Sequence, residues 1–515
     1  MALKGTTRIE LTNVRTGEKE VIEKDNLVTN AVGDILQMNP YGLRFRDYQT
    51  NFHPANEKSS AITSKYFGKQ FLPMCPNLFG GILLYEKTLE EDPEKYFAPM
   101  DNLLVGYSSN TVNSETDTKR GSMNQTESGP LDDGTGYRFV FDFSTSQGNG
   151  TIASLGLTSK MGGVGGYGSM VDTYNNFVFP VDVLSDLTNS WTSSYARRMR
   201  SVVSLDPDNN AVIYAYVSGP NTITLGKHKF PLTTLGLRDN FDSVPDNIDG
   251  SETIIVTETF ATVINSDYGT FYGTLIDGGD GYIWGFQHEG NAKGNSDGSA
   301  TILWVKISKE DWSFEEGTMT VDAQLEKFGF YNTGTGKYNN VGEEYNNLII
   351  KDGVLYAIKY ATSENYMPGV YLIPLENPTN VTLLEFEDGS SRYFRTYYSG
   401  SSSYYYYYTN VNIINGVIRY RYAYINGGQL HKANGNIESS TSSYGLQCLS
   451  GNAKPGLTYG PFIFGIGGYY YYSDFYHRVY TYIQSCYLAT INNLATPVQK
   501  TADKTMKITY ILREE

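Results

Sequence analysis

Carboxylates are the side chains of this sequence that could catalyse a reaction. Asp277, Asp280, Asp311 and Glu315 fall close together, in or beside segments with turn composition. Two carboxyl groups about 5–10 Å apart on one cleft can cleave a glycosidic bond, one as the acid and the other as base or nucleophile. Solvated turns carry acids at the same spacing, and no GxSxG motif or assignable Ser-His-Asp group accompanies them. We therefore predict no enzyme, with glycan cleavage as an alternative.

Metal-binding patterns are weak. The five histidines are scattered, with none at zinc spacing. The segment Asp206–Asn210 (DPDNN) offers oxygen ligands at alternate positions, as calcium loops do, but it lacks their later Gly and Glu and is also an ordinary turn. We predict no metal and no cofactor. The three cysteines lack metal spacing, so buried free thiols are favoured over a Cys448–Cys486 disulfide.

Tyrosine is the residue type that most clearly suggests a function. The chain holds 44 tyrosines in 515 residues, with runs at Tyr404–Tyr408 and Tyr469–Tyr472. Alternate residues of a strand face opposite sides, so such a run cannot bury all its rings in one core. Tyrosine among Ser, Gly and Asn is typical of recognition surfaces, because its ring is rigid and its hydroxyl bonds to polar groups. Aromatic faces also stack on sugar rings.

The predicted binding residues come from two segments that we expect to meet at one face, at corresponding positions of neighbouring repeats. The alternative is that these tyrosines merely suit half-buried strands, as we expect for Tyr356, Tyr371 and Tyr487. The predicted binding residues are Tyr397, Tyr398, Tyr404, Tyr406, Tyr408, Tyr469, Tyr470, Tyr471, Tyr472 and Tyr476.

The overall charge and hydropathy exclude several partners. The net charge is −15 and the acids are spread along the chain, whereas nucleic-acid binding needs a basic footprint. No apolar stretch approaches the roughly 18 residues of a membrane span, and the N-terminal residues lack the apolar segment of a signal peptide. We expect no nucleic acid, no membrane insertion and no general secretion.

Few charges (18%), many glycines (53) and 14% aromatic residues predict an all-β protein. Alternation predicts hairpins over residues 6–23 and 137–155. A short helix, capped by Asp25 or Asn26, is expected from Leu27 to Leu36, and Pro40 ends it. These elements form an N-terminal β domain over residues 1–160.

A looser repeat follows a Gly-rich linker at residues 161–168, which lacks the lysine of a phosphate-binding loop. An apolar strand follows a Gly or Asn turn in each unit, and a second strand follows a variable loop. The units predict a β-propeller-like domain of five or six blades over residues 169–498, with 171–183 completing the first or last. A β-helix or a sandwich is the alternative. A C-terminal strand over 499–515 is expected to return to the N-terminal domain. First strands are expected to begin at Ala211, Tyr282, Val354, Val417 and Phe462, and Cys486–Ala489 is expected to be a second strand.

Three segments resemble virion structural proteins of tailed bacteriophages. They read TRIELTNVRTGEKEVIEKDNLVTNAV, FVFDFSTSQGNGTIASLGLTS and LATPVQKTADKTMKITYIL. They are similar to tail-fibre, collar or tail-tip proteins of phages that infect Gram-positive gut bacteria. The resemblance covers roughly residues 1–38, 137–160 and 488–513. It implies an attachment module built from the two ends of the chain, with a variable receptor-facing domain between them. It assigns no residue roles.

The sequence thus predicts a virion protein, assembled in the host cytoplasm, that binds a host cell-surface glycan or protein through its Tyr-rich loops. Its N-terminal domain is expected to anchor it to other virion proteins. One alternative is a structural appendage such as a collar, baseplate or head decoration, and a second is a glycan depolymerase. Homo-oligomerisation is left open, because no coiled-coil heptads mark it.

Overall fold

The structure is a computed structural model of the whole chain. It describes residues 3–37, 74–109, 116–160 and 486–515 without a gap, and between residues 162 and 484 it describes the strands named below with short adjoining turns. Their regular secondary structure is nearly all β-strand. Among these residues α1 (Asn30–Gln37) is the one helix longer than a single turn, and α4 covers Met74–Asn77. The prediction of an all-β protein is confirmed.

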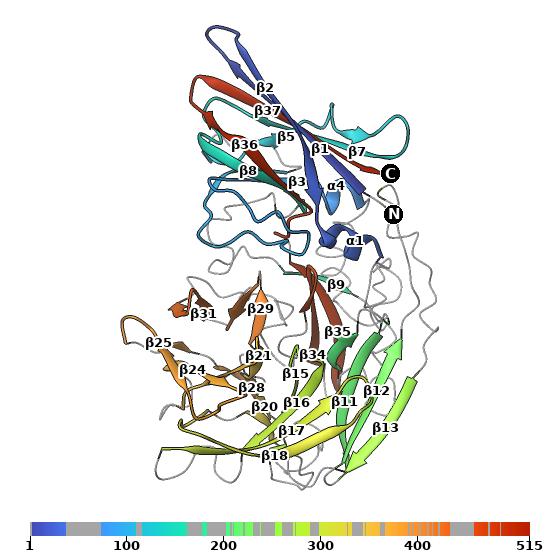
Figure 1. Cartoon of the computed structure of the whole chain (residues 1–515), viewed down its shortest axis with the longest axis vertical. Coiled ribbons are helices and arrows are strands. Elements are labelled where there is room, and N and C mark those ends of the chain that lie inside the picture. The colour runs from blue at the N-terminus through green and yellow to red at the C-terminus, as the bar shows by residue number, and fades with distance from the viewer. Residues whose placement is uncertain are drawn as a thin grey trace.

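Both ends of the chain meet in one antiparallel sheet, which we call the terminal sheet (Figure 1). Its strand order is β4-β3-β8-β36-β2-β1-β37-β7-β5, and β6 also pairs with β7. Its strands are β1 (Leu3–Asn13), β2 (Lys19–Val28), β3 (Gly81–Tyr85), β4 (Leu104–Ser108), β5 (Ser122–Met123), β6 (Gly129–Pro130), β7 (Gly136–Phe143), β8 (Gly150–Thr158), β36 (Thr490–Lys500) and β37 (Lys504–Glu514).

The terminal sheet curves until its first and last strands meet. The N–H of Gly121 donates to the carbonyl of Tyr107 at 2.9 Å, and the N–H of Met123 donates to that of Ser109 at 3.1 Å. These bonds join the chain around β5 to the chain around β4, at opposite ends of the strand order. The sheet is therefore nearly closed on itself.

The core of the terminal sheet follows from strand alternation. Residues at every second position of β1, β7 and β37 point inward, and helix α1 adds its apolar face. β37 pairs with β1 along its whole length, so the C-terminal strand contributes to this inner face beside the N-terminal one. The buried residues from these elements include Ile9, Leu11, Ala31, Val32, Ile35, Leu36, Phe139, Phe141, Phe143, Met506, Ile508, Tyr510 and Leu512.

The N-terminal hairpin continues further than the sequence suggested. β2 runs to Val28, because its last two residues pair with β36 at Thr490 and Ile491. The helix therefore begins at Asn30 and not after Asp25 or Asn26, so the predicted start was wrong. The predicted end at Pro40 lies outside the described residues, as does nearly all of the Gly-rich segment 161–168.

Between β8 and β36 the described strands form five four-stranded antiparallel sheets, numbered here along the chain. The five positions predicted to begin first strands each begin a strand, but that strand is the second of its sheet. Sheet 1 is β10 (Val202–Asp206), β11 (Ala211–Gly219), β12 (Thr222–Lys229) and β13 (Thr253–Thr259), and sheet 2 is β15 (Thr274–Asp277), β16 (Tyr282–His288), β17 (Ala300–Ser308) and β18 (Phe314–Val321). Sheet 3 is β21 (Ile349–Lys351), β22 (Val354–Ile358), β24 (Gly369–Pro374) and β25 (Thr382–Glu385), and sheet 4 is β29 (Asn412–Ile414), β30 (Val417–Arg419), β31 (Ala423–Asn426) and β32 (Gln429–Lys432). Sheet 5 is β33 (Thr458–Tyr459), β34 (Phe462–Tyr471), β35 (Asp474–Gln484) and β9 (Val178–Asp182).

Smaller sheets lie between these units. They comprise a three-stranded sheet of β14 (Phe271–Tyr272), β19 (Gly329–Tyr331) and β20 (Glu343–Tyr345), the pair β23 (Tyr366–Met367) and β26 (Arg392–Tyr393), and the pair β27 (Arg395–Gly400) and β28 (Ser403–Tyr408). Residues 486–489 are not a strand, contrary to prediction, and residues 490–498 belong to β36 of the terminal sheet.

Consecutive sheets pack face to face. Sheets 1 and 2 share one apolar cluster, sheets 2 and 3 a second, and sheets 3 and 4 a third. Sheet 2 therefore buries apolar residues on both faces, as does sheet 3. Representative buried residues are Ile213 and Ile283 in the first cluster, Ile302 and Leu355 in the second, and Val370 and Ile418 in the third.

Candidate functional site

The predicted tyrosine segments form two β-hairpins. In the β27–β28 pair, Tyr397 lies opposite Tyr406 and Tyr398 opposite Tyr405. In sheet 5, Tyr469 of β34 lies opposite Tyr476 of β35.

Tyr404 and Tyr408 also lie in β28, and Tyr470 and Tyr471 in β34, whereas Tyr472 lies outside the described residues. The two hairpins belong to different sheets, and no strand pairing among the described residues joins them.

Of the three tyrosines expected on half-buried strands, Tyr356 and Tyr371 lie there, whereas Tyr487 lies outside a strand. Tyr487 is fully buried in the core of the terminal sheet, where its hydroxyl donates to the carbonyl of Leu78. Tyr356 of β22 and Tyr371 of β24 are half-buried in sheet 3 and pack against neighbouring apolar clusters. Burial raises the pKa of both phenols.

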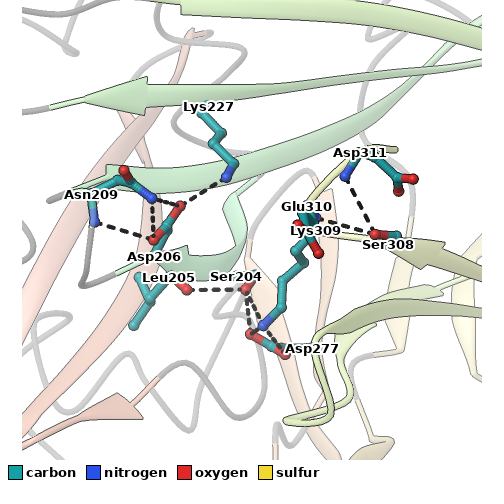
Figure 2. Close-up of polar contacts among 10 residues, drawn as sticks. All are labelled: Ser204, Leu205, Asp206, Asn209, Lys227, Asp277, Ser308, Lys309, Glu310 and Asp311. Atoms are coloured by element: carbon teal, nitrogen blue, oxygen red, sulfur yellow. Dashed lines mark hydrogen bonds and ion pairs between the residues drawn. The ribbon is translucent and has the colours of Figure 1, made fainter. Parts of the chain in front are cut away.

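Asp277, a candidate catalytic acid, sits in an ion pair between sheets 1 and 2 (Figure 2). Lys309, one residue beyond β17, places its Nζ 3.0 Å from Asp277 Oδ1 and 3.3 Å from Ser204 Oγ of β10. Ser204 in turn donates to Asp277 Oδ2. A serine beside a lysine resembles a nucleophile and its base. Ser204 is fully buried, however, and its hydroxyl already bonds to Asp277. This polar group therefore links the two sheets.

The predicted turn at residues 206–210 forms a second ion pair next to the first. Asp206 accepts from Lys227 Nζ at 2.9 Å and from the Asn209 side chain at 3.0 Å (Figure 2). Burial raises the pKa of Asp206, but the hydrogen bonds from Lys227 and Asn209 outweigh it and hold the value below 3.8. The carboxylate that a calcium ion would need is thus already neutralised by an ammonium group. No cluster of three metal-ligating side chains is present among the described residues.

The other acidic candidates stabilise turns. Asp280 accepts the backbone N–H of Tyr282 at 3.1 Å and the indole N–H of Trp284 at 3.0 Å. Asp311 accepts the Ser313 hydroxyl at 2.7 Å, which lowers the pKa of this exposed carboxyl. Glu315 is exposed on β18, opposite Lys306. These are the arrangements expected of solvated or turn-forming acids.

Two of the cysteines can be placed. Cys75 and Cys486 are buried and form no disulfide, and burial raises the pKa of the Cys75 thiol. Cys448 lies outside the described residues. No helix in the described part of the chain is both long enough and apolar enough to cross a membrane.

Sequence reasoning missed an aromatic surface on sheet 2, which we call the indole shelf: Tyr282, Trp284, Trp304 and Lys306. The ring centroids of Trp284 and Trp304 are 5.7 Å apart. The Lys306 ammonium lies 4.0 Å from the Tyr282 ring centroid and 5.1 Å from that of Trp284. All four residues are partly exposed. Their alternate spacing within the two strands was the available signal, but only the strand register brings Trp284 and Trp304 together.

No family model matches the chain, and no curated protein matches it.

Proposed function

We propose that this chain is a component of a tailed-bacteriophage particle that binds the surface of the host cell and does not act as an enzyme. The observation that carries the proposal is the pair of tyrosine-rich hairpins. In β27–β28 the tyrosine positions fall on both faces of a two-stranded sheet, so a single core cannot accommodate them all. Tyrosine offers a large rigid contact area at low entropic cost, which suits recognition of a glycan or protein.

The terminal sheet is the proposed anchor to other virion proteins. It is built from the chain segments that resemble phage virion proteins, and the repeat part between β8 and β36 is inserted into it. An inserted part of this kind is free to vary in its exposed loops while the anchoring sheet stays unchanged.

The five numbered sheets are, in this proposal, the blades of a five-bladed β-propeller. Three features support a ring. Sheets 1 to 4 pack against one another in chain order, and the first strand of sheet 2 lies against the first strands of sheets 1 and 3. The outermost strand of sheet 5 is β9, which precedes sheet 1 in the chain. Such a strand exchange joins the two ends of a ring, and Pro180 in β9 fits an edge strand.

Binding of the labelled full-length chain to intact Gram-positive gut bacteria tests the function. The key variant changes Tyr404, Tyr406 and Tyr408 to Ser, and a second variant changes them to Phe. Saturable binding that is lost with Ser and largely kept with Phe supports recognition through the aromatic rings. Equal binding by the wild type and both variants would mean that the β27–β28 hairpin does not bind the host surface. A folded chain that binds no strain, but binds other virion proteins, indicates the structural appendage instead.

A further inference from the structure

The two indoles of the indole shelf pack on the backbone of two glycines. Gly317 of β18 lies directly opposite Trp304, and a Cβ there would sit 2.9 Å from Trp304 Cζ2. A Cβ on Gly278 would sit 2.6 Å from Trp284 Cδ1. Real Cβ atoms do not approach this closely, so each indole lies directly against the backbone of its glycine. The Trp284 and Trp304 rings are neighbours on one face of sheet 2, and both are partly exposed.

Contacts within sheet 2 and with the neighbouring apolar cluster fix the orientation of the Trp284 and Trp304 rings. The indole N–H of Trp284 donates to Asp280 Oδ2 at 3.0 Å. Trp284 stacks on the buried Phe286 with a centroid distance of 5.8 Å and an interplanar angle of 11°. Both tryptophans also pack against the apolar cluster between sheets 2 and 3. A surface whose rotamers are locked in this way loses little conformational entropy when a ligand binds.

The rim of the shelf carries hydrogen-bonding groups of both kinds. Lys306 contributes ammonium donors, which lie over aromatic rings and form no ion pair with a described residue. Asp280 keeps acceptor capacity beyond the two N–H groups it binds. Glu315, exposed and opposite Lys306 on β18, adds a second carboxylate. The rim therefore complements a ligand that bears both donors and acceptors.

We propose that the indole shelf binds an uncharged saccharide of the host surface. The C–H face of a sugar ring stacks on an indole, and its hydroxyls both donate to carboxylates and accept from an ammonium group. A cationic ligand fits less well, because Lys306 already lies over the Tyr282 and Trp284 rings and leaves the Trp304 indole for a neutral ring. A polyanion is disfavoured by the net charge of −15. An apolar peptide side chain would leave the polar rim desolvated without partners. The inference rests on the proposed host-surface function and names its ligand class.

Tryptophan fluorescence of the full-length chain tests this proposal. The probes are the neutral tetrasaccharides cellotetraose, chitotetraose and mannotetraose, with tetragalacturonate and tetraethylammonium as charged competitors. We expect saturable quenching by at least one neutral probe at millimolar concentrations. Trp304→Ala weakens it about tenfold or more, the scale of one lost stacking contact with its buried area. Lys306→Met, which keeps the aliphatic stem, weakens binding without unfolding the sheet.

The matched control is Trp312→Phe. Trp312 lies in the turn between β17 and β18 and packs against the cluster shared with sheet 1, so its replacement should leave quenching by the saccharide unchanged. Trp304→Phe, which retains an aromatic ring, should keep most of the affinity and guards against a variant that fails to fold. The proposal is overturned if no neutral probe quenches, if a charged probe binds better, or if folded Trp304→Ala binds as well as the parent chain.

The two proposals fail in distinguishable ways. If wild type and Trp304→Ala bind bacteria equally and no saccharide quenches, host binding stands and the indole shelf is not its site. If saccharide binding is present but no bacterium is bound, the shelf stands as a saccharide site and the host-surface role falls.

Discussion

Lys500 allows a quantitative test of the terminal sheet, because it is a lysine with only 1% of its surface exposed. Its ammonium donates to the carbonyl of Ser144 at 2.8 Å and to Oδ1 of Asn149 at 2.7 Å, at the turn between β7 and β8. No described carboxylate forms an ion pair with it. Burial lowers the pKa of Lys500 from 10.5 to about 8, and the charge of Asp503 opposes this only in part.

The lowered pKa of Lys500 makes the free energy of unfolding depend on pH. In unfolded chains this lysine titrates near 10.5, so between about pH 8 and 10.5 the unfolded state binds more protons than the folded state. Stability then rises with pH across that window, and below it Lys500 adds no pH dependence because both states are protonated. The difference between 10.5 and 8 corresponds to about 3 kcal/mol.

Lys500→Met removes the titrating group and keeps the length of the side chain. Urea unfolding of both proteins, followed by hydrogen–deuterium exchange in peptides from β7, β8 and β36, gives the local stability at each pH. We expect the wild type to gain about 3 kcal/mol relative to the variant between pH 7.5 and 10.5. Lys504 is a partly exposed lysine paired with Glu20. Lys504→Met therefore controls for the general effect of alkaline pH and for the loss of one positive charge. A difference between wild type and Lys500→Met that stays constant within about 0.5 kcal/mol, the scale of a surface substitution, refutes the reasoning.

Three further substitutions test the packing of the sheets. Gly136→Ala places a Cβ 2.1 Å from the carbonyl oxygen of Leu512, so β7 must separate from β37; we expect a loss of more than about 2 kcal/mol in urea unfolding, and wild-type stability would contradict this pairing. Asp277→Asn leaves Lys309 without its carboxylate between sheets 1 and 2 and should cost about 1–3 kcal/mol, whereas Asp311→Asn in an exposed turn should cost about 0.5 kcal/mol or less; equal effects would contradict a linking role. Val181→Pro removes the backbone N–H of β9 opposite Thr481 and should lower the hydrogen-exchange protection of β35. Unchanged protection would mean that β9 does not stabilise this edge of sheet 5.

Local patterns predicted those elements that short-range chemistry determines. Three of the predicted strands, β16, β22 and β30, each begin directly after a glycine with positive φ. These glycines are Gly281 (88°), Gly353 (73°) and Gly416 (75°). Glycine adopts that backbone conformation at little cost, so a turn followed by an apolar run is recognisable from sequence. The alternation of residues 137–143 predicted β7 for the same reason.

Elements that depend on distant pairing could not be placed in this way. Leu27 and Val28 have a spacing compatible with a helix, yet pairing with Ile491 and Thr490 keeps them in β2. The partner of β9 is β35, almost 300 residues away in the chain, and no local signal selects it. Trp284 and Trp304 likewise become neighbours only through the register of β16 and β17.

The way the repeat part is attached bears directly on a role in binding. The chain leaves the terminal sheet after β8 and returns at β36, and these two strands pair with each other at Leu155 and Asn492. At the crossing, the N–H of Ala489 donates to the carbonyl of Leu157 at 2.7 Å, and the N–H of Leu157 donates to Thr490 Oγ1 at 3.0 Å.

A further contact ties the two parts together away from the crossing. The backbone N–H of Leu237 donates to Glu514 at 2.7 Å, and the Leu237 side chain is buried in the core of the terminal sheet. A part held by two adjacent strands and a separate buried contact cannot rotate freely, as it could on a single linker. Force applied to the repeat part is therefore shared between β8 and β36, each of which is bonded to a further strand of the nearly closed sheet. This geometry suits the proposed role, in which the terminal sheet stays bound to a particle while the repeat part binds a cell.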